Sequence, residues 1–589
     1  MTVAADTAKV KQWLSKLEKA AVAGKAEAAA ALFGTQCYWR DLVSLTWNIR
    51  TAEGQQDIAR MLAATLPGIK PSRFRIDGKA ERTGELVEAW FTFETALGRG
   101  RGHLRLKRGK GFTILTALQE LKGHEEKAGA TREMGIVHGA RRDRRVWHEQ
   151  RAKEEAELGI TRQPYCVIVG GGQGGIALGA RLKRLGVDTI ILERNPRPGD
   201  SWRNRYRTLV LHDPVWYDHL PYIPFPAHWP VFSPKNKIAD WLEMYTKVME
   251  LNYWGSSECK KAAYDPARKT WSVHVEREGK TIVLRPRQLV FATGSYGPPR
   301  EPDIKGKARF KGVQYHSSRH QTAQDFKGKR CIVVGANSSG HDICADMWEA
   351  GAHATMIQRT PTTVVRSETL MDIAFAPLYS ELAVANGIDV DKADLIFASV
   401  PFRLQAGLQK PLYRKMAKRD ADLIKRLNKA GFMTDYGEDE SGLMMKAFRT
   451  GSGYYIDVGC SDLIADGKVK VRSNVEIAEI LADSVILTDG SKLPADVIVY
   501  ATGYQPMNEW LASIMSREVA DMIGPNWGYG SGTRGDPGPW LGELRSMWKP
   551  LKQEALWLHG GNLHLSRHYS QFVALQIKAR QEGLPTPVY

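Results

Sequence analysis

The sequence lacks the cysteine patterns that mark metal sites and redox-active disulfides. It contains six cysteines, and none of them forms a CxxC or CxxxxC pair. Isolated cysteines are typical of free thiols in a reducing compartment, so we expect a cytoplasmic protein. No spacing of histidines, cysteines and carboxylates predicts a bound metal.

Long apolar runs are also missing. No stretch of about 18 apolar residues could span a bilayer, and segment 1–11 has no apolar secretory core. We therefore expect neither a membrane span nor a secretion signal. The chain carries 83 lysines and arginines against 65 aspartates and glutamates, a formal net charge of +18. These basic residues are scattered and accompany no nucleic-acid-binding motif, so we expect small anionic ligands and no nucleic acid.

The length and residue patterns of the sequence predict several domains. A chain of 589 residues exceeds the roughly 250–300 residues at which one hydrophobic core stops growing. The predicted fold class is α/β, with two Rossmann-like dinucleotide-binding domains preceded by a small α+β cone domain. The predicted order is an accessory domain at 1–122, a linker at 123–160, a first dinucleotide-binding segment at 161–305, a second dinucleotide-binding domain at 306–495 with a helical insertion at 372–450, and a return to the first domain at 496–589.

The N-terminal unit reads as two helices followed by long strands. Apolar spacing predicts helices over 10–32 and 55–66, the second ended by Pro67-Gly68, and then strands at 73–76, 86–93, 103–108 and 112–120. This order, together with Trp39-Arg40-Asp41, resembles the nuclear transport factor 2-like (SnoaL-like) cone fold. No Asp/His pair in it is arranged for catalysis, so we interpret it as an accessory domain. Such cones often self-associate, which predicts a homodimer.

A first glycine motif begins after the apolar strand 166–169. Gly170, Gly172 and Gly175 satisfy GxGxxG, a helix follows at 176–184, and the next strand ends at Glu193. In a dinucleotide-binding turn the first glycine allows the tight bend, the second admits the pyrophosphate, and the third lets helix and strand pack closely. Helix-start amides hold the phosphates, and the acid accepts a ribose hydroxyl. The complete set predicts a dinucleotide site.

The segments after Glu193 carry a family resemblance. A Gly-x-x-Trp segment ends at Trp202, a Leu-x-Leu-His-x-Pro segment contains His212, and Leu-Pro-x-x-Pro-Phe-Pro covers 220–226. Their order resembles the flavin-containing monooxygenases, especially the YUCCA-type branch. The resemblance implies that the first unit binds FAD and that Trp202 lies in the cofactor site.

A second glycine motif follows the apolar strand 331–334. It has Gly335 and Gly340 but Asn337 at the middle position, and asparagine tolerates positive φ better than most residues. The next strand ends without an acid and is followed by Arg359 and Thr360. An arginine there suits the 2′-phosphate of NADPH, with NADH left open as a second donor. The alternative is an exposed, solvated arginine.

Three further segments match the same family. Phe310, Gly312 and His316 fit the FxGxxxH fingerprint, but His320 fits neither of its known endings, which resembles type II flavin-containing monooxygenases. His316 is interpreted either as a structural histidine or as a residue that couples the domains. The resemblance implies that the Ala-Thr-Gly-Tyr element supplies Thr502 and Gly503 to the cofactor site. Asn562 precedes the last helix, predicted over 569–582, whose start the resemblance directs at the flavin.

The resemblance implies a mechanism that needs no metal and no catalytic triad. Flavin reduced by NADPH reacts with O2 to a C4a-(hydro)peroxyflavin, which oxygenates small organic substrates. His212 corresponds to the family's shielding residue, the alternative being a turn histidine, and Arg366 is a candidate for stabilising a peroxide anion. His316 completes the predicted catalytic set. Baeyer–Villiger oxidation of ketones and oxygenation of sulfides or amines both stay open.

Two other functions fit the two-dinucleotide plan. An NADPH oxidase, or a flavin-bound sensor whose cone domain binds a signal, would share every motif. A pyridine-nucleotide disulfide reductase would need a CxxxxC pair beside the first motif, where Cys166 stands alone.

Overall fold

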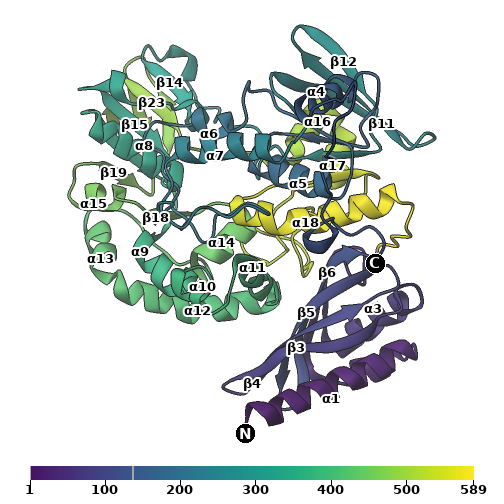
Figure 1. Cartoon of the computed structure of the whole chain (residues 1–589). Coiled ribbons are helices and arrows are strands. Elements are labelled where there is room, and N and C mark those ends of the chain that lie inside the picture. The colour runs from purple at the N-terminus through teal and green to yellow at the C-terminus, as the bar shows by residue number, and fades with distance from the viewer. Residues whose placement is uncertain (1, 136–137) are drawn as a thin grey trace.

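The computed structural model describes residues 2–135 and 138–589. Figure 1 shows an N-terminal sheet at the bottom and two parallel sheets above it. The long C-terminal helix, drawn in yellow, lies between the N-terminal sheet and the upper part of the molecule. The predicted α/β class with two Rossmann-like parallel sheets is confirmed.

The N-terminal unit packs three helices against a six-stranded sheet. The strand order is β2-β1-β6-β5-β4-β3, with β1 parallel to β6 and every other pair antiparallel. Its elements are α1 (Val3–Val22), α2 (Ala26–Ala30), β1 (Phe33–Leu42), β2 (Ile49–Glu53), α3 (Gly54–Ile69), β3 (Ser72–Thr83), β4 (Leu86–Glu94), β5 (Gly98–Lys107) and β6 (Lys110–Leu121).

Two helix predictions in this unit were wrong at their ends. The helix expected over 10–32 is two helices, interrupted at Gly24, which has a φ of +67°. α3 continues past Pro67 to Ile69 and ends at Lys70 in the left-handed region (φ 47°). A proline in the last turn removes only one helical hydrogen bond, so it does not stop the helix where the sequence suggested.

The interior of this unit is filled by aromatic rings. A Cβ added at Gly100 would overlap the ring of Phe93, and one at Gly102 would overlap the ring of Phe91. Phe74 stacks on Phe93 with 5.7 Å between ring centroids. These contacts pack the rings of β3 and β4 tightly against β5.

The first parallel sheet has the strand order β24-β13-β7-β8-β9. It joins strands from residues 166–291 to one from 556–558, so the chain returns to this sheet near its end. Its elements are β7 (Cys166–Val169), α5 (Gln173–Arg184), β8 (Thr189–Leu192), α6 (Asp200–Arg203), α7 (Lys235–Val248), β9 (Tyr253–Trp254), the antiparallel β10 (Ser257–Asp265), β11 (Thr270–Arg277) and β12 (Lys280–Leu284), β13 (Gln288–Phe291), α16 (Asn508–Ile514), α17 (Arg517–Ile523), β24 (Leu556–Leu558) and α18 (Leu563–Gln581).

α18 begins six residues before the predicted start of the last helix. Asn562 caps it, because its side-chain oxygen accepts a hydrogen bond from the amide of Leu565 (3.0 Å). The first turn is buried, and it packs on α5 of the glycine motif.

The second parallel sheet has the strand order β14-β23-β15-β16-β19. β23 falls after the predicted boundary at 495 but pairs with β14 and β15 of this sheet. The elements are β14 (Val313–His316), β15 (Arg330–Val334), α8 (Ser338–Glu349), β16 (His353–Gln358), the pair β17 (Thr363–Arg366) and β18 (Tyr454–Asp457), α15 (Cys460–Ala465), β19 (Lys470–Ser473), the antiparallel β20 (Ile477–Ile480), β21 (Ser484–Leu487) and β22 (Lys492–Pro494), and β23 (Val497–Tyr500).

The stretch between β17 and β18 is helical, as its composition predicts. It contains α9 (Ser367–Leu370), a π-turn over Met371–Phe375, α10 (Glu381–Ala385), α11 (Val390–Ala398), α12 (Phe402–Arg419), α13 (Ala421–Lys429) and α14 (Gly442–Thr450). Its apolar side chains form a cluster with Tyr217 from the loop after α6. This loop therefore packs between the first sheet's unit and the insertion.

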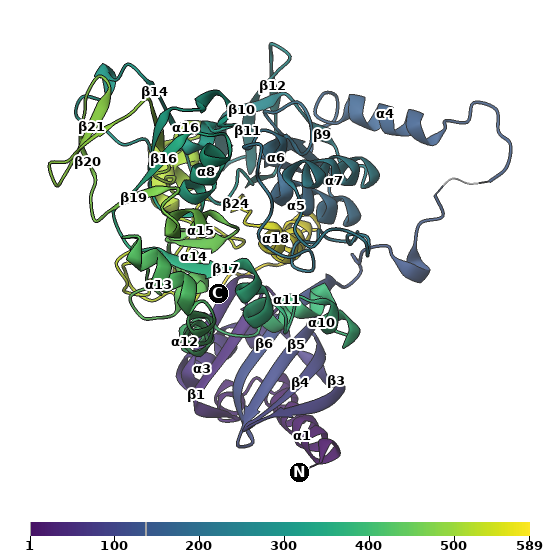
Figure 2. The same ribbon diagram turned by 90° about the vertical axis from the view of Figure 1, so that its left-hand side faces the viewer.

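The linker leaves the N-terminal sheet, loops out from the body and returns through α4 (Trp147–Glu157), as Figure 2 shows. Trp147 donates its indole hydrogen to Glu250 (2.9 Å), and Lys183 pairs with Glu154 (2.8 Å). α4 is thus held to the ends of α7 and α5 by polar contacts.

Candidate functional site

The first glycine turn connects β7 to α5 in the strained geometry that only glycine adopts readily. Gly170 has a φ of +110°, and a Cβ there would overlap the carbonyl oxygen of Ala292. A Cβ at Gly175 would overlap the carbonyl oxygen of Gly170. These two glycines are required by the packing of the protein itself.

Gly172 behaves differently and tests whether a dinucleotide fits. Its backbone is extended (φ −77°), and the nearest atom to an added Cβ is the hydroxyl oxygen of Ser201, at 3.6 Å. The protein alone would accept a side chain there. The space lies over the first turn of α5, whose cap has no side-chain hydrogen bond. The packing of the protein does not require a glycine at this position, and the amides of the first helical turn can bind an anion. Together these features suit a pyrophosphate.

Glu193 follows β8 and faces the glycine turn. It is 8% exposed, and its carboxylate accepts hydrogen bonds from the amide of Gly171 (2.8 Å) and from Asn195 (2.9 Å to the amide, 2.7 Å to the side chain). The acid therefore fixes the loop that forms the turn. Its role toward a ribose stays a prediction.

Gln173 joins three segments that the sequence singled out separately. Its side-chain oxygen accepts from the indole nitrogen of Trp202 (3.3 Å), and its side-chain nitrogen donates to the carbonyl of Gly561 (3.1 Å). The glycine turn, Trp202 and the start of α18 at Asn562 thus meet at one side chain. Sequence reasoning missed Gln173, for which its place inside the motif was the only signal.

His212 lies in the loop after α6, beside a second residue that sequence reasoning missed. Its Nε2 is 4.0 Å from the carboxylate of Asp213, and the His212 side chain is 38% exposed. Burial raises the pKa of Asp213, while the nearby charges of His212 and His564 and a hydrogen bond with Asn562 oppose the rise. His212 is therefore an accessible imidazole next to a carboxyl group that faces the start of α18.

The second glycine turn connects β15 to α8. Gly335 has a φ of +122°, and a Cβ there would overlap the carbonyl oxygen of Ala501, as one at Gly340 would overlap that of Gly335. Asn337 is extended, with a φ of −98°. The prediction that asparagine serves a positive φ at this position was wrong, because the first glycine takes the left-handed conformation in both motifs.

Arg359 and Thr360 follow β16 on the surface. The Arg359 side chain is 72% exposed, and its Nη1 lies 3.3 Å from Glu476. A guanidinium this open can exchange a surface carboxylate for a phosphate at little cost. Recognition of a 2′-phosphate stays a prediction.

His316 and Gly503, predicted independently, are in direct contact. His316 is fully buried, and its Nε2 donates to the carbonyl of Gly503 (3.0 Å), while Nδ1 accepts from the amide of Ser318 (3.1 Å). These bonds fit one neutral tautomer, and burial lowers the pKa of His316. Thr502 donates to the carbonyl of Arg300 (2.5 Å), so the two chain crossings between the sheets run side by side.

His320, the atypical end of the fingerprint, is also buried. Its Nε2 lies 2.9 Å from the carboxylate of Asp346 in α8, and its Nδ1 lies 2.9 Å from the hydroxyl of Tyr315. Thr208, from the loop after α6, donates to the same aspartate (3.4 Å). His320 thus lies where the second glycine helix meets the first sheet's unit.

Arg366 lies apart from these groups, at the end of β17. Its guanidinium binds both carboxylate oxygens of Asp422 (2.8 Å each), and its amide donates to Asp420 (2.9 Å). The arginine is thereby committed to α13. Its predicted catalytic role gains no support from this placement and stays a prediction.

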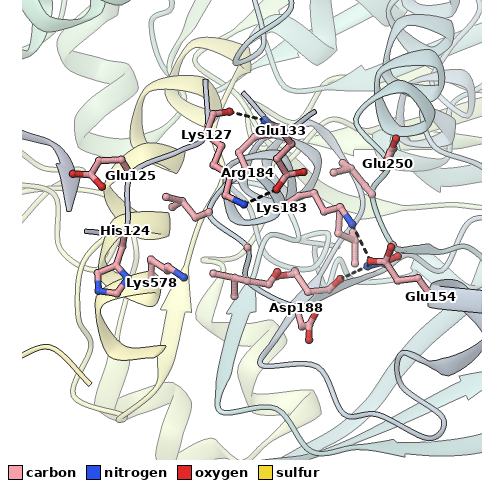
Figure 3. A pocket seen from close by; sticks show the side chains of 18 of the residues that line it. His124, Glu125, Lys127, Glu133, Glu154, Lys183, Arg184, Asp188, Glu250 and Lys578 are labelled. Atoms are coloured by element: carbon pink, nitrogen blue, oxygen red, sulfur yellow. Dashed lines mark hydrogen bonds and ion pairs between the residues drawn. The ribbon is translucent and has the colours of Figure 1, made fainter. Parts of the chain in front are cut away.

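A cavity of about 520 Å³ lies under the linker, and Figure 3 shows its side chains. It includes Thr189, the first residue of β8, so it opens at the amino ends of the parallel strands. Cofactors of such sheets bind at the carboxyl ends. Two of its lysines are paired inside it, Lys183 with Glu154 (2.8 Å) and Lys127 with Glu133 (2.9 Å). The cavity is therefore separate from the glycine turns.

Other kinds of centre find no support within residues 2–135 and 138–589. No group of three or more histidine, cysteine or acidic side chains there could hold a metal ion. No helix in these two ranges is long and apolar enough to cross a membrane. All six cysteines are buried and unpaired.

Comparison with known proteins decides the family. The rice (Oryza sativa subsp. japonica) indole-3-pyruvate monooxygenase YUCCA1 is 31% identical over 367 residues, which cover 61% of this chain and 81% of the relative. The chain belongs to the class B flavin monooxygenase family. This flavin monooxygenase also matches the family model described as pyridine nucleotide-disulphide oxidoreductase over residues 167–382. The Arabidopsis thaliana probable indole-3-pyruvate monooxygenase YUCCA10 is 28% identical, over 58% of this chain and 81% of the relative.

Solved structures agree on the fold of this flavin monooxygenase. An ε-caprolactone-bound cyclohexanone monooxygenase has a TM-score of 0.51 at 19% identity, over 71% of this chain and 88% of the other. OTEMO in complex with FAD and NADP has a TM-score of 0.51 at 20% identity, over 72% and 87%. The enzyme is thus an oxidoreductase of the flavin-dependent monooxygenase type, and the predicted cofactor pair of FAD and NADPH is that of its family.

Proposed function

We propose that the enzyme uses FAD, NADPH and O2 to insert one oxygen atom into small organic substrates, either ketones or sulfides and amines. The observation that carries the proposal is the convergence on Gln173 of the glycine turn, Trp202 and the start of α18. A pocket built from these three segments suits a flavin nucleotide, with its pyrophosphate at Gly172 and its ring toward Asn562. Reduced flavin supplies the oxygen-activating chemistry, and the protein supplies orientation and dryness.

NADPH is assigned to the second glycine turn. Its pyrophosphate would meet the first turn of α8 beside Asn337, and Arg359 with Thr360 would meet the adenosine 2′-phosphate. The buried bond from His316 to Gly503 ties the two crossings between the sheets, which supports a role for His316 in setting their relative orientation.

His212 is the residue we propose for controlling protons and water beside the flavin ring. Its imidazole is accessible, and the carboxyl group of Asp213, whose side chain is 16% exposed, lies 4.0 Å away. An imidazole there can hold a proton at Nε2 and exclude bulk water from the ring. The alternative, a histidine that only caps the turn before Pro214, predicts that its replacement leaves oxygen transfer unchanged.

The N-terminal unit is proposed as a nuclear transport factor 2-like accessory domain without its own active site. The rings of Phe74, Phe91 and Phe93 take up part of the interior in which a sensor would bind a signal. An NADPH oxidase remains the second candidate, because the exposed imidazole of His212 leaves water a route to the ring. The expected homodimer stays a prediction.

Product analysis under ¹⁸O2 tests the proposal. Purified enzyme with NADPH is offered cyclohexanone and methyl phenyl sulfide, and NADPH consumed, H2O2 released and oxygenated product are counted. We expect one ¹⁸O atom in the lactone or the sulfoxide for each NADPH that does not appear as H2O2. Equal amounts of NADPH and H2O2 with every probe would establish the oxidase instead.

A further inference from the structure

We propose that the N-terminal unit is an internal clamp, in which Arg40 holds α11 against α18 and thereby positions the loop that carries His212. The inference concerns how the chain is held together and does not depend on which substrate is oxygenated. It gives the accessory unit a task that is carried out through its outer surface.

Arg40 leaves β1 and enters the rest of the protein as a fully enclosed cation. Its side chain is 3% exposed, and it binds both carboxylate oxygens of Glu543 (2.7 and 2.8 Å). Thr51 of β2 donates to the same carboxylate (2.6 Å). Buried ion pairs add little net stability, since desolvation offsets their attraction, but they tolerate only one arrangement of their partners.

The same guanidinium contacts both α11 and α18. Its Nη1 donates to the carbonyl of Ala398, the last residue of α11 (2.7 Å), and its Nη2 donates to the hydroxyl of Tyr569 in α18 (3.3 Å). Arg105 of β5 donates to the next carbonyl, that of Ser399 (3.1 Å). Helix-end carbonyls lack partners within the helix, so two arginines of the N-terminal unit complete the end of α11.

α11 needs such support because it has only nine residues, fewer than an isolated helix needs to persist in water. One turn before Ala398 it presents Asp394, whose two oxygens bind Arg567 of α18 (2.9 Å each). Tyr379 donates to the same carboxylate (2.9 Å). The two helices are thus joined by a second enclosed ion pair, next to the point where Arg40 bridges them.

The chain of contacts from Arg40 continues to the loop that carries His212. Arg567 also donates to the carbonyls of Tyr217 (2.9 Å) and His219 (2.5 Å). These residues follow His212 in the same loop, and the Tyr217 ring stacks on His564 in the first turn of α18 (4.5 Å between centroids). A displacement of α11 therefore reaches the loop of His212 through Arg567.

Hydrogen exchange of the full-length enzyme measures the clamp directly. We expect Arg40→Met to speed exchange at least tenfold in 390–398 and in 213–223, although Arg40 does not contact the second segment. Exchange in β7 should stay within twofold, because none of the hydrogen bonds of Arg40 reaches that strand. The matched control is Arg75→Met, which removes the ion pair between the exposed Arg75 of β3 and Glu18 of α1. It should leave the exchange rate of 390–398 unchanged.

A paired substitution separates the clamp from the mere penalty of an unpaired buried charge. Arg40→Met combined with Glu543→Leu removes both charges and should be more stable than the single variant, in which the enclosed Glu543 carboxylate has lost its partner. The clamp requires that 390–398 and 213–223 still exchange at least tenfold faster, because the bonds to Ala398 and Tyr569 are gone. Recovery of slow exchange in the paired variant, or faster exchange confined to the N-terminal unit, would overturn the proposal.

Discussion

The strongest test of the cofactor site compares two glycines of the first motif. The packing of the protein requires Gly175, whereas Gly172 leaves space for a ligand. Gly175→Ala adds a methyl group that overlaps the carbonyl of Gly170, so the start of α5 must shift. Overpacking of this kind costs about 1–3 kcal/mol of stability. Gly172→Ala meets nothing closer than Ser201, at 3.6 Å, and its extended backbone suits alanine. A poorer helix cap costs about 1 kcal/mol at most.

FAD binding should rank the two variants in another way. The Gly172→Ala methyl group occupies the space assigned to the pyrophosphate, and losing one charge-assisted hydrogen bond costs about 1.5–3 kcal/mol. At about 1.4 kcal/mol per tenfold, FAD should bind roughly 10- to 100-fold more weakly. Gly407→Ala, on an exposed position of α12 with nothing within 4 Å, is the matched control. It should leave FAD binding unchanged and raise stability by up to about 1 kcal/mol, because alanine favours the helix.

The assay has two parts on the same preparations. Thermal unfolding of protein stripped of FAD gives the effect on the fold, and quenching of flavin fluorescence during titration gives the dissociation constant. The reasoning fails if Gly172→Ala binds FAD within threefold of the parent. It fails equally if stripped Gly172→Ala unfolds as early as stripped Gly175→Ala.

Three further predictions follow from single side chains. Arg359→Ala should raise the Michaelis constant for NADPH at least tenfold and that for NADH less than twofold, with Arg472→Ala on the neighbouring β19 as control; equal effects on both would contradict a 2′-phosphate site. His559 is buried and its pKa lowered to about 3, below the unfolded value of about 6.5, so the unfolded chain binds the proton first. Stability held above pH 6.5 is therefore lost as pH falls, by about 2 kcal/mol per such histidine between pH 7 and pH 5, and denaturant titrations at both pH values should show a smaller loss in His559→Phe. Asp394→Asn leaves Arg567 enclosed without a counter-charge and should lower stability by about 3 kcal/mol; an unchanged denaturation midpoint would refute that account.

Short-range features of this chain were open to prediction from sequence. The turn at Gly170 joins a strand, a bend and a helix within about 20 residues, and each step follows from local conformational limits. The meeting of His316 with Gly503 was predictable only through family resemblance, since 187 residues separate them. Helix ends were harder, and α18 starts at Leu563 because Asn562 caps it, while apolar spacing begins only later.

The enclosed ion pairs that join distant parts of the chain could not be predicted from the sequence. Asp394 and Arg567 lie 173 residues apart, and Arg40 and Glu543 lie 503 apart. In a sequence with 25% charged residues, nothing distinguishes these four from solvated surface groups. Burial of a charge becomes visible only when tertiary structure supplies its partner.

The middle position of the two glycine motifs shows what such a motif specifies. Both Gly172 and Asn337 are extended, with φ of −77° and −98°, so neither residue is there to relieve backbone strain. The strained backbone is at Gly170 and Gly335, where an added Cβ would overlap the carbonyl oxygens of Ala292 and Ala501. The middle residue sets only how closely a ligand can approach the helix start. A glycine there admits the closest contact, and an asparagine keeps a ligand further out or bonds to it.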